Sequence, residues 1–302
     1  MNERRVIALG FFDGVHIGHG ALLKKTCERA TELGAIPAAM SFDTHPDTLV
    51  FGTPTELLNT MDERKHLMQS LYGIEDVIFC HFDRDMMNMP WEAFVEDYLV
   101  KELHACHLVC GHDYRFGARG LGDAQKLAEK CRALGLGCDV IGEVKLDGIT
   151  VSSTYIRQLV ESGDVERAAH FLGHRHCMTQ TVGHGQRIGR TIGIPTVNLA
   201  VPGHVLVPKH GVYVSRVYLP GGKSYAGVTN VGTRPTVSDS CTVSVETFLL
   251  DFQGDLYGQR LRLEYCRRLR DEEKFGSLEQ LRDMIRKNIE QTRAYFRESC
   301  IE

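Results

Sequence analysis

Short apolar runs alternate with amphipathic segments through the first half of the chain, and this alternation predicts its fold. The runs have the length of strands, and the segments between them repeat their apolar residues as one face of a helix does. Strands alternating with helices form a parallel sheet covered on both faces, so we expect a doubly wound α/β domain. The expected strands are 6–9, 36–42, 76–82, 107–111 and 137–142, and the expected helices are 18–34, 61–72, 90–103 and 123–134.

The pattern changes near Gly173, where a helical repeat ends at a glycine typical of a helix C-cap. Strand-length runs then follow one another without helices between them, which predicts a small antiparallel β-barrel. A helix that starts at a Ser277-x-x-Gln280 capping box closes the chain. We therefore predict two domains, 1–173 and 174–302. The expected strands are 211–218, 225–231, 242–251 and 259–265, and the closing helix carries an apolar stripe of Leu278, Leu281, Ile285, Ile289 and Phe296.

The segment GFFDGVHIGH, residues 10–19, lies at the first predicted strand-to-helix turn. A helix N-terminus attracts phosphate, and Gly14 and Gly18 allow a phosphate to approach the backbone closely. His16 and His19 can donate hydrogen bonds to phosphate oxygens as charge develops in a transition state. Ordinary turn histidines would show the same spacing, but the glycine-rich strand–turn–helix context favours a site for a nucleoside triphosphate.

Three more polar segments follow predicted strands: SFDTHP at 41–46, GHDYRFG at 111–117 and VSSTYIR at 151–157. The carboxyl ends of parallel strands share one sheet edge, so we expect these segments to meet the opening motif there. The hydroxyls of Ser152, Ser153 and Thr154 suit phosphate contact, with Arg157 one turn later. Helix capping alone would also explain them.

The second half holds a glycine-rich stretch, GHGQRIGRTIGIPTVN at 183–198, which lacks the spacing of a Walker A loop. Thr196 and Asn198 would face the same way on an extended chain and could offer oxygen ligands to Mg²⁺. A turn is the alternative explanation of Pro-Thr-x-Asn. Glu246 lies among apolar neighbours, where a carboxylate is costly unless it has a task, so it is a candidate general base.

The composition of the chain limits the classes of function that it can have. The chain has 302 residues, of which 43% are hydrophobic and 25% charged, with a net charge of −4, so nucleic-acid binding has no general electrostatic support. The first apolar run is too short for a signal peptide or a membrane helix, and we expect a cytoplasmic protein without a membrane partner. The ten cysteines contain no CxxC pair and are expected to be reduced. Residues 104–112 carry zinc-ligand chemistry, but their pattern fits a buried strand better.

The four motifs of the first half, in this order, resemble the adenylyltransferase half of bacterial bifunctional riboflavin kinase/FAD synthetases. The chain departs from the family at Tyr155, where the family usually has arginine, and at Arg119-Gly120, whose order is reversed. The resemblance implies ATP binding by Gly10, Phe11, Asp13, Gly14, His16, Gly18, His19, Ser152, Ser153, Thr154 and Arg157, and flavin contacts by His45, Pro46, Asp113, Tyr114 and Phe116.

The second half is similar to the riboflavin kinase domain of the same family through GRTIGIPTVN, GVTNVGTRPTV, VETF and LRDEEKF. The resemblance implies that Thr196 and Asn198 bind Mg-ATP and that Glu246 activates the terminal ribityl hydroxyl of the flavin. It also implies ATP contacts by Gly185, Arg190, Gly193 and Pro195, and a flavin contact by Arg270. The expected substrates are riboflavin, FMN and ATP, with Mg²⁺ as cofactor; the oligomeric state stays open.

Two other functions remain possible from the residues. An adenylyltransferase with another acceptor, such as a pantetheine or nicotinate nucleotide, would leave Thr196, Asn198 and Glu246 without a use. A non-enzymatic flavin-binding regulator would be expected to have lost its reactive residues, whereas His16 and His19 are both present. The sequence therefore favours two consecutive reactions, riboflavin to FMN and FMN to FAD.

Overall fold

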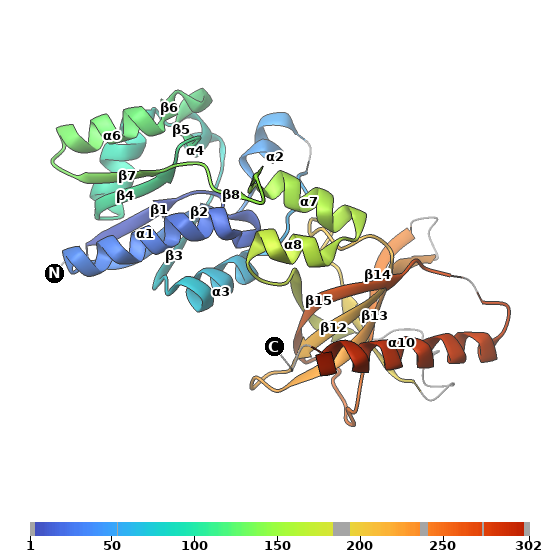
Figure 1. Cartoon of the computed structure of the whole chain (residues 1–302). Coiled ribbons are helices and arrows are strands. Elements are labelled where there is room, and N and C mark those ends of the chain that lie inside the picture. The colour runs from blue at the N-terminus through green and yellow to red at the C-terminus, as the bar shows by residue number, and fades with distance from the viewer. Residues whose placement is uncertain (1–3, 53, 184–193, 236–240, 274, 299–302) are drawn as a thin grey trace. The chain divides into compact units, whose positions relative to one another are not determined.

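The computed structural model describes residues 4–52, 54–183, 194–235, 241–273 and 275–298 (Figure 1). The chain forms two compact units, Met1–Ser153 and Thr154–Glu302. Helices α7 (Ser153–Ser162) and α8 (Val165–Leu172) precede Gly173 in the chain, and α8 packs against the barrel of the second unit. Gly173 ends α8 in the left-handed conformation expected of a C-cap. The domain boundary near Gly173 stays a prediction.

The first unit is built on a parallel sheet in the order β3-β2-β1-β4-β7, which confirms the α/β prediction. Helices α1 (Ile17–Leu33) and α3 (Met61–Tyr72) bury their apolar side chains on one face of the sheet. Segment η2 (Phe94–Glu102) and α6 (Ala124–Ala133) cover the other. The strands are β1 (Arg5–Leu9), β2 (Ile36–Phe42), β3 (Asp76–Cys80), β4 (Ala105–Gly111) and β7 (Gly137–Ile141).

Local signals set several helix boundaries in this unit. The Thr60 side chain accepts a hydrogen bond from the Glu63 amide, and the Glu63 carboxylate accepts one from the Thr60 amide, so the two residues form a capping box at α3. The helix expected at 90–103 is a short α5 that continues as the π-helix η2, whose wider turn a 3.6-residue repeat does not predict. The other elements are η1 (Asp13–Val15), α2 (Pro46–Phe51), α4 (Arg84–Asn88), α5 (Trp91–Ala93), β5 (Arg115–Phe116), η3 (Ala118–Gly120), β6 (Gly122–Asp123), β8 (Lys145–Leu146) and β9 (Ile149–Thr150).

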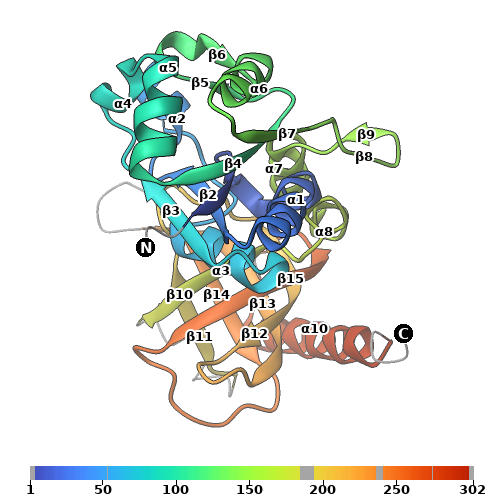
Figure 2. The ribbon, with the colours of Figure 1, turned by 90° about the vertical axis from the view of Figure 1, so that its left-hand side faces the viewer.

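The second unit contains a closed antiparallel barrel in the order β10-β11-β14-β13-β12-β15 (Figure 2). The barrel confirms the predicted architecture, but two of its strands, β10 and β11, were not expected. The sequence CMTQTVG of β10 has a polar centre, and the short β11 follows a proline, so neither shows a clear strand pattern. The strands are β10 (Cys177–Gly183), β11 (Thr196–Ala200), β12 (Gly211–Tyr218), β13 (Ser224–Pro235), β14 (Cys241–Leu249) and β15 (Arg260–Arg270).

Alternation along β14 decides which side chains face the barrel interior. Val245, Thr247 and Leu249 are buried, whereas Glu246 between the first two is half-buried and lies on the outer face. The Thr247 hydroxyl contacts that of Thr229 at 2.9 Å, in a buried chain that reaches Ser215 on β12. The barrel interior is therefore filled by packed side chains and hydroxyl contacts. Glu246, the candidate base, lies outside it.

The closing helix α10 (Leu278–Glu298) begins as predicted, with the Ser277 hydroxyl accepting a hydrogen bond from the Gln280 amide at 3.2 Å. Its predicted apolar stripe is only partly correct. Ile289 packs against the barrel, but Leu278 is 61% exposed. The fully buried residues of the helix are Asn288 and Thr292.

Candidate active sites

The loop between β1 and α1 holds an unusual backbone conformation. Phe12 and Val15 have φ of 58° and 43°, and Gly14 between them has φ of 78°. Non-glycine residues in this left-handed region are strained, and such strain gathers at functional sites. The loop is fixed by Asp13, which is 2% exposed and whose carboxylate accepts a hydrogen bond from the Leu58 amide at 2.9 Å. The GFFDG segment is thus held rigidly at the carboxyl end of β1.

The two histidines of the motif stack on one another at the N-terminus of α1. Their ring centroids lie 3.5 Å apart with an interplanar angle of 11°. His16 caps the helix, because its Nδ1 accepts a hydrogen bond from the His19 amide at 3.1 Å. A Cβ on Gly18 would lie 3.1 Å from the His16 ring, so Gly18 makes room for the imidazole. The motif therefore presents a paired imidazole surface beside free helix amides.

His19 is held in its neutral form at neutral pH. Burial lowers the pKa of His19 well below its ordinary value, and the charges of His16 and Arg64 lower it further. The Nδ1 atom of His19 is buried and has no hydrogen-bond partner among the described residues. A buried polar atom of this kind can be satisfied by an incoming polar ligand. The environment of His19 therefore differs from that of a solvated turn residue.

Two other predicted segments reach this loop. The Ser153 hydroxyl donates to the Asp13 carbonyl at 2.9 Å, which places the Ser152-Ser153 segment at the GFFDG loop. The ring centroids of His45 and Phe11 lie 4.5 Å apart in a T-shaped arrangement, and Pro46 begins α2 directly after His45. Thr154 and Arg157 lie farther along α7, in residues that belong to the second unit. The first unit therefore gathers most of the residues expected at the ATP site.

The GHDYRFG segment differs in exposure from one residue to the next. Asp113 is exposed and Tyr114 is half-buried, and burial raises the pKa of the Tyr114 hydroxyl. Phe116 is only 7% exposed and packs in the core against Phe94. Of the three flavin contacts expected here, Asp113 and Tyr114 are thus the more accessible.

The two departures from the family pattern have definite surroundings. The Tyr155 hydroxyl accepts a hydrogen bond from Arg167 Nε at 3.0 Å, so a guanidinium from α8 contacts this position. Arg119 lies in η3 with φ of 55°, followed by Gly120 with φ of 61°. Both positions are left-handed, so the arginine occupies a left-handed position in either order.

An ion pair that the sequence did not predict joins the ends of β2 and β3. His81 Nδ1 lies 2.6 Å from Asp43 Oδ2, and the same carboxylate accepts a hydrogen bond from the Phe82 amide. The hydrogen bond to Asp43 raises the pKa of His81. Burial alone would raise the pKa of Asp43, but the bonds from His81 and Phe82 lower it overall. The pair holds the segment that carries His45.

This ion pair predicts a pH dependence of stability. A histidine whose pKa rises on folding stabilises the fold fully below its unfolded pKa of about 6.5, and the effect fades as pH rises through the folded pKa. Asp43 acts in the opposite direction, losing its contribution below about pH 4. We expect the melting temperature of His81→Gln to change less than that of the wild type between pH 6 and pH 8.5, measured by circular dichroism. Equal changes in both proteins would refute this role of His81.

The outer face of the barrel carries a polar row across three strands. Asn198 on β11 pairs with Glu246 on β14, which in turn pairs with Asn230 on β13. The Thr196 hydroxyl donates to Glu246 Oε2 at 3.3 Å, and the Asn230 amide donates to Glu272 Oε1 at 3.3 Å. The structure therefore brings together Thr196, Asn198 and Glu246. The structure also places Asn230 and Glu272 beside them. In the sequence, these two residues are marked only by their positions within the GVTNVGT and LRDEEKF motifs.

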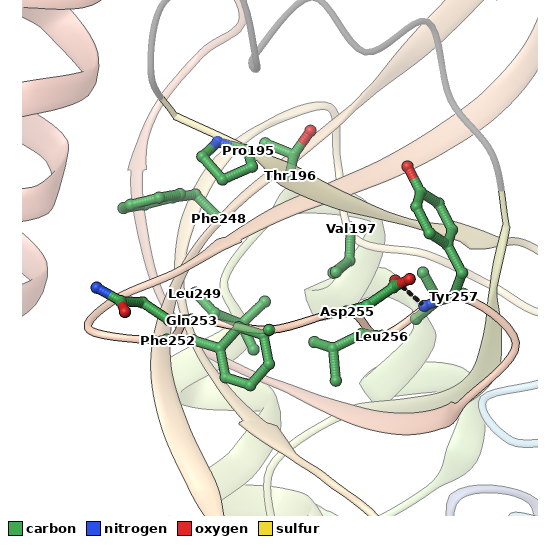
Figure 3. A pocket seen from close by; sticks show the side chains of 12 residues that line it. Pro195, Thr196, Val197, Phe248, Leu249, Phe252, Gln253, Asp255, Leu256 and Tyr257 are labelled. Carbon is green, nitrogen blue, oxygen red and sulfur yellow. Dashed lines mark hydrogen bonds between the residues drawn. The ribbon is translucent and has the colours of Figure 1, made fainter.

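A cavity of about 220 Å³ adjoins this row. Figure 3 shows Pro195 and Thr196 at one edge of the cavity, with Phe252 and Leu256 across from them. Asp255 accepts a hydrogen bond from the Tyr257 amide at 3.0 Å and thereby shapes the loop that forms the far wall. The full lining is Val182, Pro195, Thr196, Val197, Phe248, Leu249, Phe252, Gln253, Gly254, Asp255, Leu256 and Tyr257.

Of the remaining predicted kinase residues, only Arg270 lies in the described part of the chain. Gly185, Arg190 and Gly193 fall outside the described residues. Arg270 ends β15, where its guanidinium donates to the Asp271 carbonyl and lies 5.6 Å from the centroid of the Phe275 ring. The cavity is lined by residues of β10, β11, β14 and the loop after β14.

Each half of the chain matches a known protein family. The FAD synthetase family matches residues 1–155, and the riboflavin kinase family matches residues 172–296. A bifunctional riboflavin kinase/FMN adenylyltransferase from Listeria monocytogenes is 33% identical over 97% of this chain and 92% of its own length. The chain belongs to this bifunctional family. A member from Pseudomonas fluorescens is 35% identical over 96% of this chain and 92% of its own length.

A solved structure from Streptococcus pneumoniae, described as a macrolide-efflux protein, has the same fold. It superposes with a TM-score of 0.85 and 28% identity, covering 97% of this chain and 95% of its own. In the described part of the present chain, no helix has both the length and the apolar character needed to cross a membrane. The bifunctional family forms FMN from riboflavin and FAD from FMN, and this chain carries both of its enzyme domains, with ATP as substrate.

Proposed function

We propose that the two reactions take place at the two sites described above. Riboflavin is phosphorylated on the outer face of the barrel, at Thr196, Asn198 and Glu246, and FMN is adenylylated at the carboxyl edge of the parallel sheet, at His16 and His19. The observation that carries this assignment is the position of the two sites in different units, each unit containing most of the segment that one enzyme family matches.

At the barrel, Glu246 acts as general base. Its carboxylate takes the proton of the terminal ribityl hydroxyl while that oxygen attacks the γ-phosphorus of ATP and ADP leaves. The hydrogen bond from Thr196 orients the carboxylate. The adjacent cavity has a partly apolar lining suited to the nucleotide, and Pro195 forms part of its wall. Gly185, Arg190 and Gly193 remain predicted ATP contacts and Arg270 a predicted flavin contact.

The residues of this site fit Mg²⁺. Thr196 and Asn198 supply neutral oxygen atoms beside the Glu246 carboxylate, and Mg²⁺ prefers oxygen ligands completed by water and substrate phosphates. Among the described residues, no group of three or more His, Cys, Asp or Glu side chains could hold a metal ion, so a cage made only of such side chains is not expected. Bound Mg²⁺ would neutralise the charge on the transferred phosphate.

At the sheet edge, a phosphate oxygen of FMN attacks the α-phosphorus of ATP, and pyrophosphate leaves. His16 and His19 donate hydrogen bonds to the triphosphate, whose negative charge also favours the N-terminus of α1. The loop of Gly10, Phe11, Asp13, Gly14 and Gly18 shapes this site. Ser152, Ser153, Thr154 and Arg157 contact ATP, and His45, Pro46, Asp113, Tyr114 and Phe116 form the flavin side.

Labelled ATP tests the proposed chemistry. With riboflavin, Mg²⁺ and ATP labelled at the γ-phosphate, we expect label in FMN and in FAD. With ATP labelled at the α-phosphate, we expect FAD to be the only labelled flavin, while the ADP released by the kinase reaction keeps the same label. Chromatographic separation of the products measures both. Label from the α-phosphate in a product other than FAD and ADP would instead support an adenylyltransferase with a different acceptor.

A further inference from the structure

Arg64 is an unexpected feature of the first unit. It lies on α3, and its side chain is the largest of the fully buried ones among the described residues, with 0% of its surface exposed to solvent. Arginine is rarely buried completely unless a specific partner holds it. Arg64 lies on the same helix face as Leu67 and Met68, which pack beneath the parallel sheet.

The guanidinium of Arg64 joins the ends of two strands. Nη1 donates to the Phe11 carbonyl at 2.8 Å and to the Ser41 hydroxyl at 2.9 Å, and Nη2 donates to the Phe42 carbonyl at 3.1 Å. The Ser41 hydroxyl itself donates to the Phe11 carbonyl at 2.7 Å. One side chain therefore connects the loop after β1, which leads to His16, with the end of β2, which leads to His45.

The charged guanidinium of Arg64 donates its hydrogen bonds to neutral groups. Its three acceptors are carbonyls and a hydroxyl, and its guanidinium carbon lies 4.3 Å from the centroid of the Phe11 ring. Asp13 and Asp43 act on it only through longer-range charge. Burial lowers the pKa of Arg64 to about 10, so the group is still charged at neutral pH. A buried charge without a bound counter-charge is costly, and an anionic ligand at the adjacent loop would offset that cost.

We propose that Arg64 is a positioning residue for adenylyl transfer, which fixes the loop after β1 against the end of β2 and sets the charge environment of His19. The inference rests on the proposed function of the sheet edge. Arg64 acts from beneath the loop, through Phe11, and not by touching the substrate. Burial is the main cause of the lowered pKa of His19, and the charges of His16, at the N-terminus of α1, and of Arg64 on α3 lower it further. Arg64 therefore contributes both to the loop geometry and to the protonation of His19.

Two substitutions separate the charge of Arg64 from its geometry. Arg64→Met removes the charge and all three hydrogen bonds, whereas Arg64→Lys keeps the charge but lacks the fork that contacts three acceptors at once. Each variant is measured for FMN adenylylation, for riboflavin phosphorylation and for the titration of His19 by NMR. Thermal unfolding verifies that both units are folded, and riboflavin phosphorylation, which depends on the other unit, shows whether the loss is confined to adenylylation.

We expect Arg64→Met to lower kcat/KM for adenylylation by about 100-fold, the effect of a displaced catalytic group. Arg64→Lys should show a smaller loss. The pKa of His19 should rise in Arg64→Met and stay low in Arg64→Lys, and riboflavin phosphorylation should be unchanged in both. A merely structural role would not separate the two variants in the His19 titration.

Wild-type adenylylation in Arg64→Met would overturn the proposal, and so would an equal loss of both activities or an unchanged pKa of His19. If Arg64→Met does not fold, Arg64→Lys carries the test: reduced adenylylation with intact phosphorylation supports the proposal, and wild-type adenylylation overturns it. If the wild type makes no FAD, the proposed function fails, whereas the His19 titration still decides whether Arg64 controls that histidine.

Discussion

Glu246→Gln should stop FMN formation while leaving the adenylylation of added FMN unchanged. Loss of a general base lowers a rate by about 100- to 10,000-fold, and we expect a fall in riboflavin phosphorylation within this range. Glutamine has nearly the same shape and can still accept the hydrogen bond from Thr196, which is 3.3 Å long. The substitution therefore removes the base with little change to the polar row.

The matched control is Glu290→Gln, the same chemical change on the exposed face of α10. It should phosphorylate riboflavin at the wild-type rate. Both reactions are followed separately by chromatography, starting from riboflavin or from FMN. If Glu246→Gln blocked adenylylation of FMN and spared phosphorylation of riboflavin, the assignment of the two sites would be reversed.

His19→Ala should have the opposite effect. Removing one hydrogen-bond donor that stabilises developing charge costs about 100- to 1,000-fold in rate, and we expect this loss in FAD formation alone. His19 is preferable to His16 for this test, because the His16 side chain also caps α1. The backbone amide of His19, which donates to His16, is kept in the variant.

His66→Ala serves as the control, since His66 is an exposed histidine on α3. This variant should form FAD from FMN at the wild-type rate. Steady-state assays with FMN and ATP measure the effect, and thermal unfolding verifies that both variants are folded. Wild-type FAD formation by His19→Ala would show that the stacked imidazole pair is not part of the reaction.

Much of the architecture could be predicted because the strands of the parallel sheet are continuous apolar runs. The residues of β1, for example, are buried on both faces from Val6 to Leu9. β11 could not be predicted in this way. It is short, follows a proline and has only Leu199 fully buried, so its strand character comes from pairing with β10 and β14.

The sites were predictable as motifs, but their internal contacts were not. Thr196 and Glu246 are separated by fifty positions and meet only through the pairing of β11 with β14. Arg64 lies among charged neighbours, which is typical of a solvated helix face. Its spacing from Leu67 and Met68 is the signal that places it on the buried face instead.

A mixing experiment tests the central claim, that one chain carries two independent sites acting in sequence. With riboflavin, ATP and Mg²⁺, Glu246→Gln alone should leave riboflavin unconverted, and His19→Ala alone should stop at FMN. The two variants together should produce FAD, because FMN released by one is adenylylated by the other. FAD in the mixture, with FMN as its precursor, is the predicted result; no FAD in the mixture, when each variant keeps its remaining activity, would contradict the account.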